Sequence, residues 1–115
     1  MKSLVVYYSR NGNAKFVAET IAKELGSDIE EIVDLKNRQG KLNFLSAGSD
    51  ASRGRETQIA DTKLSPADYD LVVVGGPVWA GNPTPAVRTY LNKNNGLAGK
   101  KAALFLTQTH LNHQL

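Results

Sequence analysis

The residues from Asp70 to Gly75 limit what this chain can fold into more than any other stretch. They read Asp-Leu-Val-Val-Val-Gly, an aliphatic run without polar alternation. Such a strand is buried on both faces, which is typical of a parallel sheet covered by helices on both sides. The run therefore predicts an α/β fold.

Strand and helix patterns alternate before this run. Ser3–Tyr8 is a short apolar strand, and the apolar positions of residues 14–25 have helical spacing before Gly26, a good C-terminal stop. Asp28–Leu35 mixes aliphatic residues with acids, which predicts a strand at a sheet edge with one wet side. Residues 36–63 are irregular, with one helical face possible between Leu42 and Ala51 and a brief pairing possible at Gln58–Ile59.

The pattern continues to the end of the sheet. Ser65–Tyr69 predicts a capped turn. Thr84 is a candidate N-cap with Pro85 at the first helical position, and that helix is predicted to end at 94–96. Lys101–Thr107 is the fourth predicted strand. Because right-handed crossovers join such units, we expect one doubly wound parallel sheet.

Composition narrows the class of protein. The chain has 115 residues, 41% hydrophobic and 22% charged, which fits a single domain over residues 1–115. It contains no cysteine, which excludes disulfide scaffolds, zinc–cysteine sites, iron–sulfur clusters and cysteine catalysis. The sequence has no membrane-spanning run and no signal-peptide pattern, so we expect a cytoplasmic protein. The net charge of +3 comes from scattered basic residues.

Two loops follow strands and are predicted to meet at one edge of the sheet. In open parallel sheets, ligands bind outside the carboxyl ends of the strands. The first loop, Ser9–Ala14, is small and polar, and it leads into a helix N-terminus whose free N–H groups favour an anion. Arg10 adds a cation, and Gly12 lets the backbone approach a ligand. An ordinary strand-to-helix turn explains the same stretch about equally well.

The second loop, Pro77–Asn82, is apolar and aromatic. Trp79 lies between proline and glycine residues, which favours a stacking platform over partial burial in the core, the usual fate of a tryptophan. A phosphate site beside an aromatic surface fits a phosphorylated, flat, ring-shaped ligand.

The segments 5–14 and 68–81 together resemble the flavodoxin family. The first is similar to the family's Ser/Thr-x-Thr-Gly-Asn-Thr phosphate loop, and the second to its Gly-x-Pro-x-Trp loop. The resemblance implies a flavodoxin-like, doubly wound parallel sheet with FMN at the switch point, which is a known arrangement of this fold. The strand order would be 2-1-3-4, without the family's usual fifth strand and last helix.

The resemblance also implies residue roles. Ser9, Gly12 and Asn13 match the phosphate loop, whereas Asn11 and Ala14 replace the usual threonines, and Ala14 loses a hydrogen-bonding side chain. Trp79 would stack on the flavin ring, whose redox-active edge would lie near the backbone of residues 80–81. No catalytic or metal-binding residue is implied. The FMN-binding residues so implied are Ser9, Arg10, Asn11, Gly12, Asn13, Ala14, Pro77, Val78, Trp79, Ala80, Gly81 and Thr107.

The functional prediction is an FMN-binding redox protein, either an electron carrier or an oxidoreductase of the NAD(P)H/quinone type. Its partner would be a redox protein or a small electron donor or acceptor. The alternative is a non-redox interaction module with weak or no FMN binding. Many flavodoxins are acidic, whereas this chain is basic. The sequence ends soon after the fourth strand, so we expect an exposed sheet edge that a homo-oligomer covers, or else a poorly ordered C-terminal region.

Other functions fit the sequence poorly. A phosphoacceptor receiver domain needs clustered aspartates where this chain has Tyr8-Ser9 and Gly75-Gly76. A hydrolase that used Ser9 would need an oriented base, and both histidines are in the tail, where His110 is predicted to be solvated. A nucleic-acid-binding surface would interleave basic and aromatic residues, and this pattern is absent from the sequence.

Overall fold

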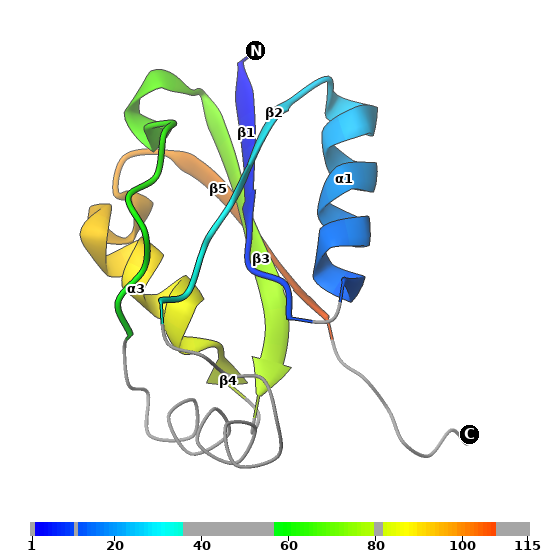
Figure 1. The fold of residues 1–115 in the computed structure, drawn as a ribbon. Coiled ribbons are helices and arrows are strands. Elements are labelled where there is room, and N and C mark those ends of the chain that lie inside the picture. The colour runs from blue at the N-terminus through cyan, green and yellow to red at the C-terminus, as the bar shows by residue number, and fades with distance from the viewer. Residues whose placement is uncertain (1, 11, 36–56, 80–81, 108–115) are drawn as a thin grey trace.

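A computed structural model describes residues 2–10, 12–35, 57–79 and 82–107 of the chain. Its sheet has four parallel strands in the order β2-β1-β3-β5, which is the predicted order 2-1-3-4 (Figure 1). A two-residue strand, β4, pairs antiparallel with the end of β3. The strands and helices are β1 (Ser3–Tyr7), α1 (Asn13–Leu25), β2 (Asp28–Glu31), β3 (Leu71–Trp79), β4 (Asn82–Pro83), α3 (Pro85–Lys93) and β5 (Lys101–Thr107), with single 3₁₀ turns at Pro66–Asp68 and Asn95–Leu97.

The pairing of β1 with β3 forms the centre of the sheet. Leu4 pairs with Val72 and Val6 with Val74, and all four side chains are buried. Successive residues point to opposite faces, so each strand supplies both faces of the sheet. Burial on both sides confirms what the aliphatic run predicts.

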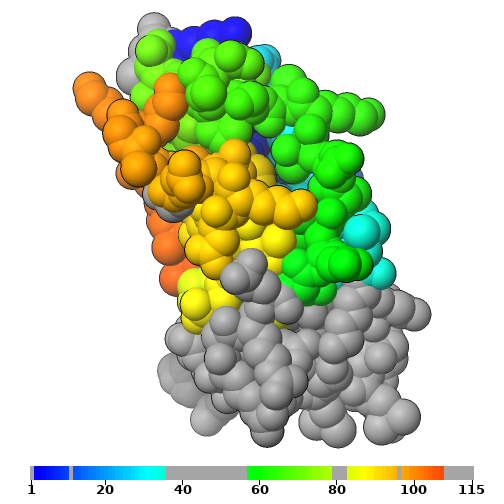
Figure 2. Space-filling model, turned by 90° about the vertical axis from the view of Figure 1, so that its left-hand side faces the viewer, coloured from blue at the N-terminus to red at the C-terminus, as the bar shows by residue number. Residues whose placement is uncertain are grey.

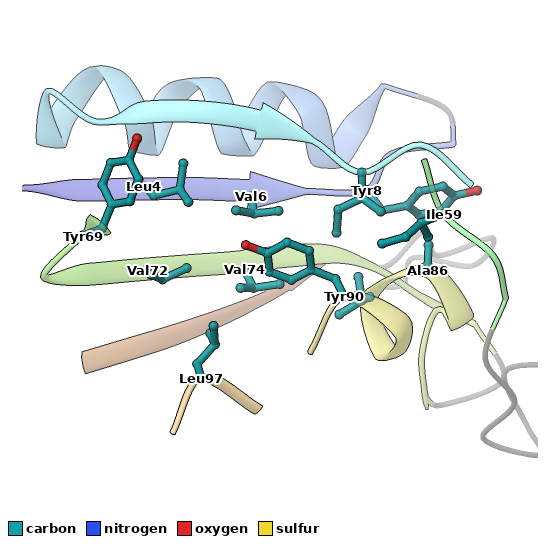
Figure 3. Packing of buried hydrophobic residues seen from close by; sticks show 12 residues of the cluster. Leu4, Val6, Tyr8, Ile59, Tyr69, Val72, Val74, Ala86, Tyr90 and Leu97 are labelled. Atoms are coloured by element: carbon teal, nitrogen blue, oxygen red, sulfur yellow. The ribbon is translucent and has the colours of Figure 1, made fainter. Parts of the chain in front are cut away.

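Helices lie on both faces of this sheet. α1 covers one face with alanines at every fourth position, Ala14, Ala18 and Ala22, which let the helix approach β1 and β3 closely. α3 and residues 57–70 lie side by side over the other face (Figure 2). There Tyr90 reaches from α3 toward Val74 in the larger of the two core clusters (Figure 3). In the described ranges, no helix has the length and apolar character needed to cross a membrane.

The second strand is shorter than the sequence predicts. β2 ends at Glu31, whereas the prediction extended it to Leu35. The chain instead pairs residues 33–35 antiparallel with residues 58–60, since Ala60 N–H donates to Val33 O and Leu35 N–H donates to Gln58 O, both at 2.9 Å. The brief pairing predicted at Gln58–Ile59 is therefore confirmed. The helical face predicted within 42–51 lies outside the described residues.

Hydrogen bonds join the chain just before residue 36 to the chain just after residue 56. Thr57 Oγ1 donates to Asp34 Oδ1 at 3.0 Å. Thr89 Oγ1 accepts from Thr57 N–H at 3.0 Å and lies 2.6 Å from Thr57 O, so a buried hydroxyl on α3 engages both backbone groups of Thr57. Residues 34–35 and 57–58 thus form a stem fixed to α3.

The structure differs from the sequence-based prediction in one strand boundary and in one helix cap. β3 continues through Trp79, so Pro77 and Val78, predicted as loop, are strand residues that pair with β5 and β4. Thr84 does occupy the N-cap position of α3, but its side chain makes no capping bond. Its Oγ1 is buried without a hydrogen-bond partner among the described residues. The capped turn at Ser65 is confirmed, because Ser65 Oγ accepts from Ala67 N–H at 3.3 Å.

Two buried tyrosines differ in how their hydroxyls are satisfied. Tyr69 donates to Asp28 Oδ2 at 2.7 Å, and this hydrogen bond is the main reason that its pKa is raised to about 12. Tyr90 has no hydrogen-bond partner for its hydroxyl among the described residues. Desolvation, followed by the charge of Glu30, raises the pKa of Tyr90 to about 12.

We predict opposite stability effects when each hydroxyl is removed. Tyr90→Phe keeps the packing and relieves an unpaired buried hydroxyl, so the free energy of unfolding should stay equal or rise by about 1 kcal/mol. Tyr69→Phe leaves Asp28 without its donor and should lower it. Urea unfolding at neutral pH measures both values, and a clear loss in Tyr90→Phe would show that its hydroxyl has a partner.

We also predict alkaline destabilisation. Both tyrosines keep their protons in the folded state up to a pKa of about 12, against an ordinary value of 10.0. Below pH 10 both tyrosines are protonated in the folded and in the unfolded chain, so they add no pH dependence there. As the pH rises from 10 toward 12 the free energy of unfolding falls, because the unfolded chain releases its protons first. Urea unfolding across this range should show a smaller decline in Tyr90→Phe than in the parent. An identical decline would contradict the assignment.

Candidate functional site

The carboxyl ends of β1, β3 and β5 meet at one edge of the sheet, which we call the carboxyl edge. Tyr7 pairs with Gly75, and Pro77 pairs with Thr107 at the end of β5. Tyr8 N–H then donates to Gly75 O at 2.9 Å, which extends the contact between β1 and β3. α1 begins at this edge too (Figure 1). The structure thus brings together the chain segments that carry the predicted site.

The first predicted loop is a tight turn into α1. Ser9 Oγ accepts from Gly12 N–H at 2.9 Å, and Gly12 has φ of 91° and ψ of −13°. This left-handed conformation suits glycine, since a side chain there is strained. Phe16 N–H donates to Gly12 O at 3.0 Å, which is the first backbone bond of the helix.

This geometry leaves donors at the start of α1. The N–H groups of residues 13–15 precede the first helical hydrogen bond and have no acceptor within the helix. Ser9 Oγ uses a lone pair for Gly12, so its own proton remains to be donated. The first turn of α1 contains no acidic residue. With the positive end of the helix dipole, these groups suit an anion.

The side chains of this turn have unequal access to a ligand. Asn13 is exposed, and Ser9 and Arg10 are half-buried. Ala14 is buried against the sheet, so it can offer a ligand its backbone N–H but no side-chain group. Asn11, Ala80 and Gly81 were predicted as site residues and lie outside the described residues.

The second predicted loop is a β-hairpin. Val78 pairs with Pro83 and Trp79 with Asn82 in the antiparallel contact between β3 and β4. The hairpin places the backbone of Trp79 beyond the end of the parallel sheet, on the same edge as the Ser9–Gly12 turn. Thr107 is half-buried beside Pro77. Among the described residues, no three acidic or histidine side chains gather as metal ligands.

Two adjacent glycines in the middle of β3 let neighbouring elements pack closely against the strand. A Cβ on Gly76 would lie 3.0 Å from Tyr8 O and 3.2 Å from Val87 Cγ2. A Cβ on Gly75 would lie 2.1–2.3 Å from the ring of Phe105, so that ring rests directly on the glycine backbone. The sequence shows the glycines but not the contact with Phe105, because that contact depends on the register of β5.

A family model described as flavodoxin matches residues 2–111. The chain belongs to the flavodoxin family. This confirms the resemblance drawn from the two loops.

The curated relatives carry oxidoreductase names. The chain is 32% identical to NAD(P)H dehydrogenase (quinone) 3 of Rhizobium meliloti (strain 1021), over 97% of this chain and 55% of that protein. It is 31% identical to an NAD(P)H dehydrogenase (quinone) of Chromohalobacter salexigens, over 84% of this chain and 48% of that protein. The chain spans about half the length of these relatives.

Solved structures share the fold. A flavoprotein from Lactobacillus acidophilus NCFM, crystallised in complex with FMN, matches with a TM-score of 0.81 and 27% identity, over 97% of this chain and 78% of that one. A flavoprotein fold from Bacteroides eggerthii matches with a TM-score of 0.80 and 23% identity, over 95% of this chain and 72% of that one. The second likeness supports the fold alone.

We predict an energetic coupling between Gly75 and Phe105. Gly75→Ala forces the ring off the strand and should lower the free energy of unfolding by about 1–3 kcal/mol. In a Phe105→Ala background the ring is absent, so the same substitution should cost less. Urea unfolding of the two single variants and the double variant measures the coupling, and additive losses would contradict the contact.

Proposed function

We propose that this chain binds FMN at the carboxyl edge and serves as a redox flavoprotein. The Ser9–Gly12 turn carries the proposal, because it leads into a helix N-terminus that has no acidic residue and whose N–H groups at residues 13–15 have no acceptor within the helix. The FMN complex of the Lactobacillus acidophilus neighbour and the flavodoxin family match support the same cofactor. The donor set on this edge fits a phosphate monoester.

Each segment of the edge has a distinct task in this proposal. Ser9 Oγ and the N–H groups of residues 13–15 would hold the phosphate, with the side chains of Asn13 and Arg10 at its rim. Trp79 would stack on the flavin, and the backbone of residues 80–81 and Thr107 would border the ring. Bound FMN would supply the electron chemistry. The protein would position the ring and exclude water from one side.

The names of the curated relatives support a more specific activity. Both are NAD(P)H dehydrogenases of the quinone type, so electrons would come from a nicotinamide and pass to a quinone. The basic balance of this chain, +3, also suits an anionic nicotinamide nucleotide better than the acidic surface of a carrier would.

FMN titration tests the cofactor and the phosphate site together. The parent should quench flavin fluorescence and bind FMN more tightly than riboflavin, which lacks the phosphate. Gly12→Ala strains a residue at φ of 91° and should weaken FMN binding about tenfold, with less effect on riboflavin. Gly26→Ala is a matched control, because Gly26 has φ of 62° at the other end of α1 and equally open space around it.

Trp79→Ala distinguishes the contribution of ring stacking from that of phosphate binding. It should weaken the binding of FMN and of riboflavin about equally, by a factor of about 5–10, which corresponds to a stacking energy of about 1 kcal/mol. If the parent neither quenches FMN nor retains it after desalting, the chain is instead a non-redox interaction module of the same fold. Equal affinity for FMN and riboflavin would contradict the phosphate site.

A further inference from the structure

The turn that joins α3 to β5 contains an asparagine followed by a glycine (Figure 1). Asn95 and Gly96 begin the 3₁₀ turn that follows α3, which ends at Lys93. In an Asn-Gly pair the side-chain amide carbon lies within reach of the next backbone nitrogen, and glycine has no side chain to shield that nitrogen. The pair is therefore a candidate for a reaction between a side chain and the backbone.

The Asn95 side chain is open to reaction, whereas that of its neighbour is held. Asn95 is exposed, and in the part of the chain that the structure describes no hydrogen bond restrains its amide. Asn94 is half-buried, and its Nδ2 donates to Tyr90 O at 2.8 Å. The residue after Asn94 also has a side chain beside its nitrogen. The two adjacent asparagines therefore form a matched pair that differs in both reacting groups.

The backbone bonds of this turn do not use the nitrogen that would attack. Leu97 N–H donates to Asn94 O at 2.9 Å, and Ala98 N–H donates to Asn95 O at 3.2 Å. The Gly96 N–H precedes the first of these bonds, so the turn itself offers it no acceptor. Asn95 has φ of 54°, a left-handed conformation that asparagine tolerates better than most residues. This explains why a reactive residue is found here.

The other Asn-Gly pair of the chain, Asn11-Gly12, has its nitrogen engaged. Gly12 N–H donates to Ser9 Oγ at 2.9 Å. A hydrogen bond that holds the neutral N–H makes the nitrogen harder to deprotonate, and the bond must break before the nitrogen can attack. Ser9 therefore protects the turn that carries the anion site. Among the described residues, no such bond protects Gly96.

We propose that Asn95 is the preferred site of spontaneous deamidation in this protein. The Gly96 nitrogen gives its proton to a solvent base and attacks Cγ of Asn95, forming a C–N bond as the side-chain nitrogen leaves as ammonia. The product is a cyclic succinimide. Water then adds to one of its two carbonyl carbons and breaks the bond to the ring nitrogen, which takes a proton back. Residue 95 becomes aspartate or isoaspartate, and one water has been exchanged for one ammonia.

The two products differ in their effect on the fold. Each puts a negative charge just beyond the C-terminus of α3, where the helix dipole is already negative. Isoaspartate also inserts a methylene group into the backbone before Gly96. Leu97 follows directly, is buried in the core with φ of 63°, and accepts at its carbonyl from Lys100 N–H at 3.0 Å. A backbone shift here displaces a core side chain, so isoaspartate should destabilise the fold more than aspartate.

Peptide mapping by mass spectrometry, after incubation of the purified chain at mildly alkaline pH, measures the reaction. The mass gain of deamidation should accumulate at Asn95 several-fold faster than at Asn11 or Asn94. Gly96→Ala adds a side chain beside the attacking nitrogen and should slow the modification of Asn95 several-fold. If Asn95 stays unmodified while Asn11 or Asn94 reacts, or if no site reacts, the proposal is overturned.

Two further variants test the selectivity and the structural effect. Ser9→Ala releases the Gly12 N–H and should speed the modification of Asn11 several-fold without changing that of Asn95. Equal rates at the two sites in the parent would contradict the protection. Asn95→Asp carries the charge without the extra methylene, so its urea midpoint should lie between those of the parent and of the isoaspartyl form collected by ion exchange. An isoaspartyl form as stable as the parent would contradict the displacement of Leu97. None of these measurements depends on flavin, so the FMN proposal is tested separately.

Discussion

The parallel pairing of β1 with β3 is the contact on which the rest of the molecule depends. Leu4, Val6, Val72 and Val74 are buried beneath α3, while Val5 and Val73 are buried beneath α1. Because the two strands run in the same direction, their carboxyl ends reach the same edge, and both the turn after β1 and the hairpin after β3 follow from that edge. A hydrophobic contact at the middle of the sheet thus determines where polar donors and an aromatic loop meet.

The sequence predicts most of this architecture because burial on both faces leaves a clear pattern. Aliphatic runs identify the strands, alanine spacing identifies α1, and Thr84-Pro85 identifies the start of α3. The errors arise where tertiary contacts decide. Asp28–Leu35 contains enough aliphatic residues for a long strand, yet it leaves the sheet after Glu31 to pair with residues 58–60. Gly76-Pro77 resembles the start of a loop, yet pairing with β5 and β4 keeps it in a strand.

The candidate site also contains residues that the sequence predicts and residues that only tertiary contacts reveal. Ser9 and Gly12 are predictable because a turn from a strand into a helix has its own residue preferences, and the positive φ of Gly12 explains why glycine stands there. Phe105 could not be found from its own neighbourhood, because only the register of β5 brings its ring onto Gly75. The roles of Pro77, Val78 and Thr107 toward a ligand remain predictions, although the structure places all three at the carboxyl edge.

The stem at residues 34–35 and 57–58 has a consequence for how proteins of this kind can diverge. Residues 34 and 57 are held together by the hydrogen bond between Thr57 Oγ1 and Asp34 Oδ1. Thr89 Oγ1 holds the Thr57 backbone through hydrogen bonds to its N–H and C=O groups. Asp34, Thr57 and Thr89 therefore link the chain beyond β2 to α3 through side chains of three separate segments. Substitutions at these three positions can loosen that link while the pairing of β1 with β3, which none of them contacts through the ladder, keeps the sheet register.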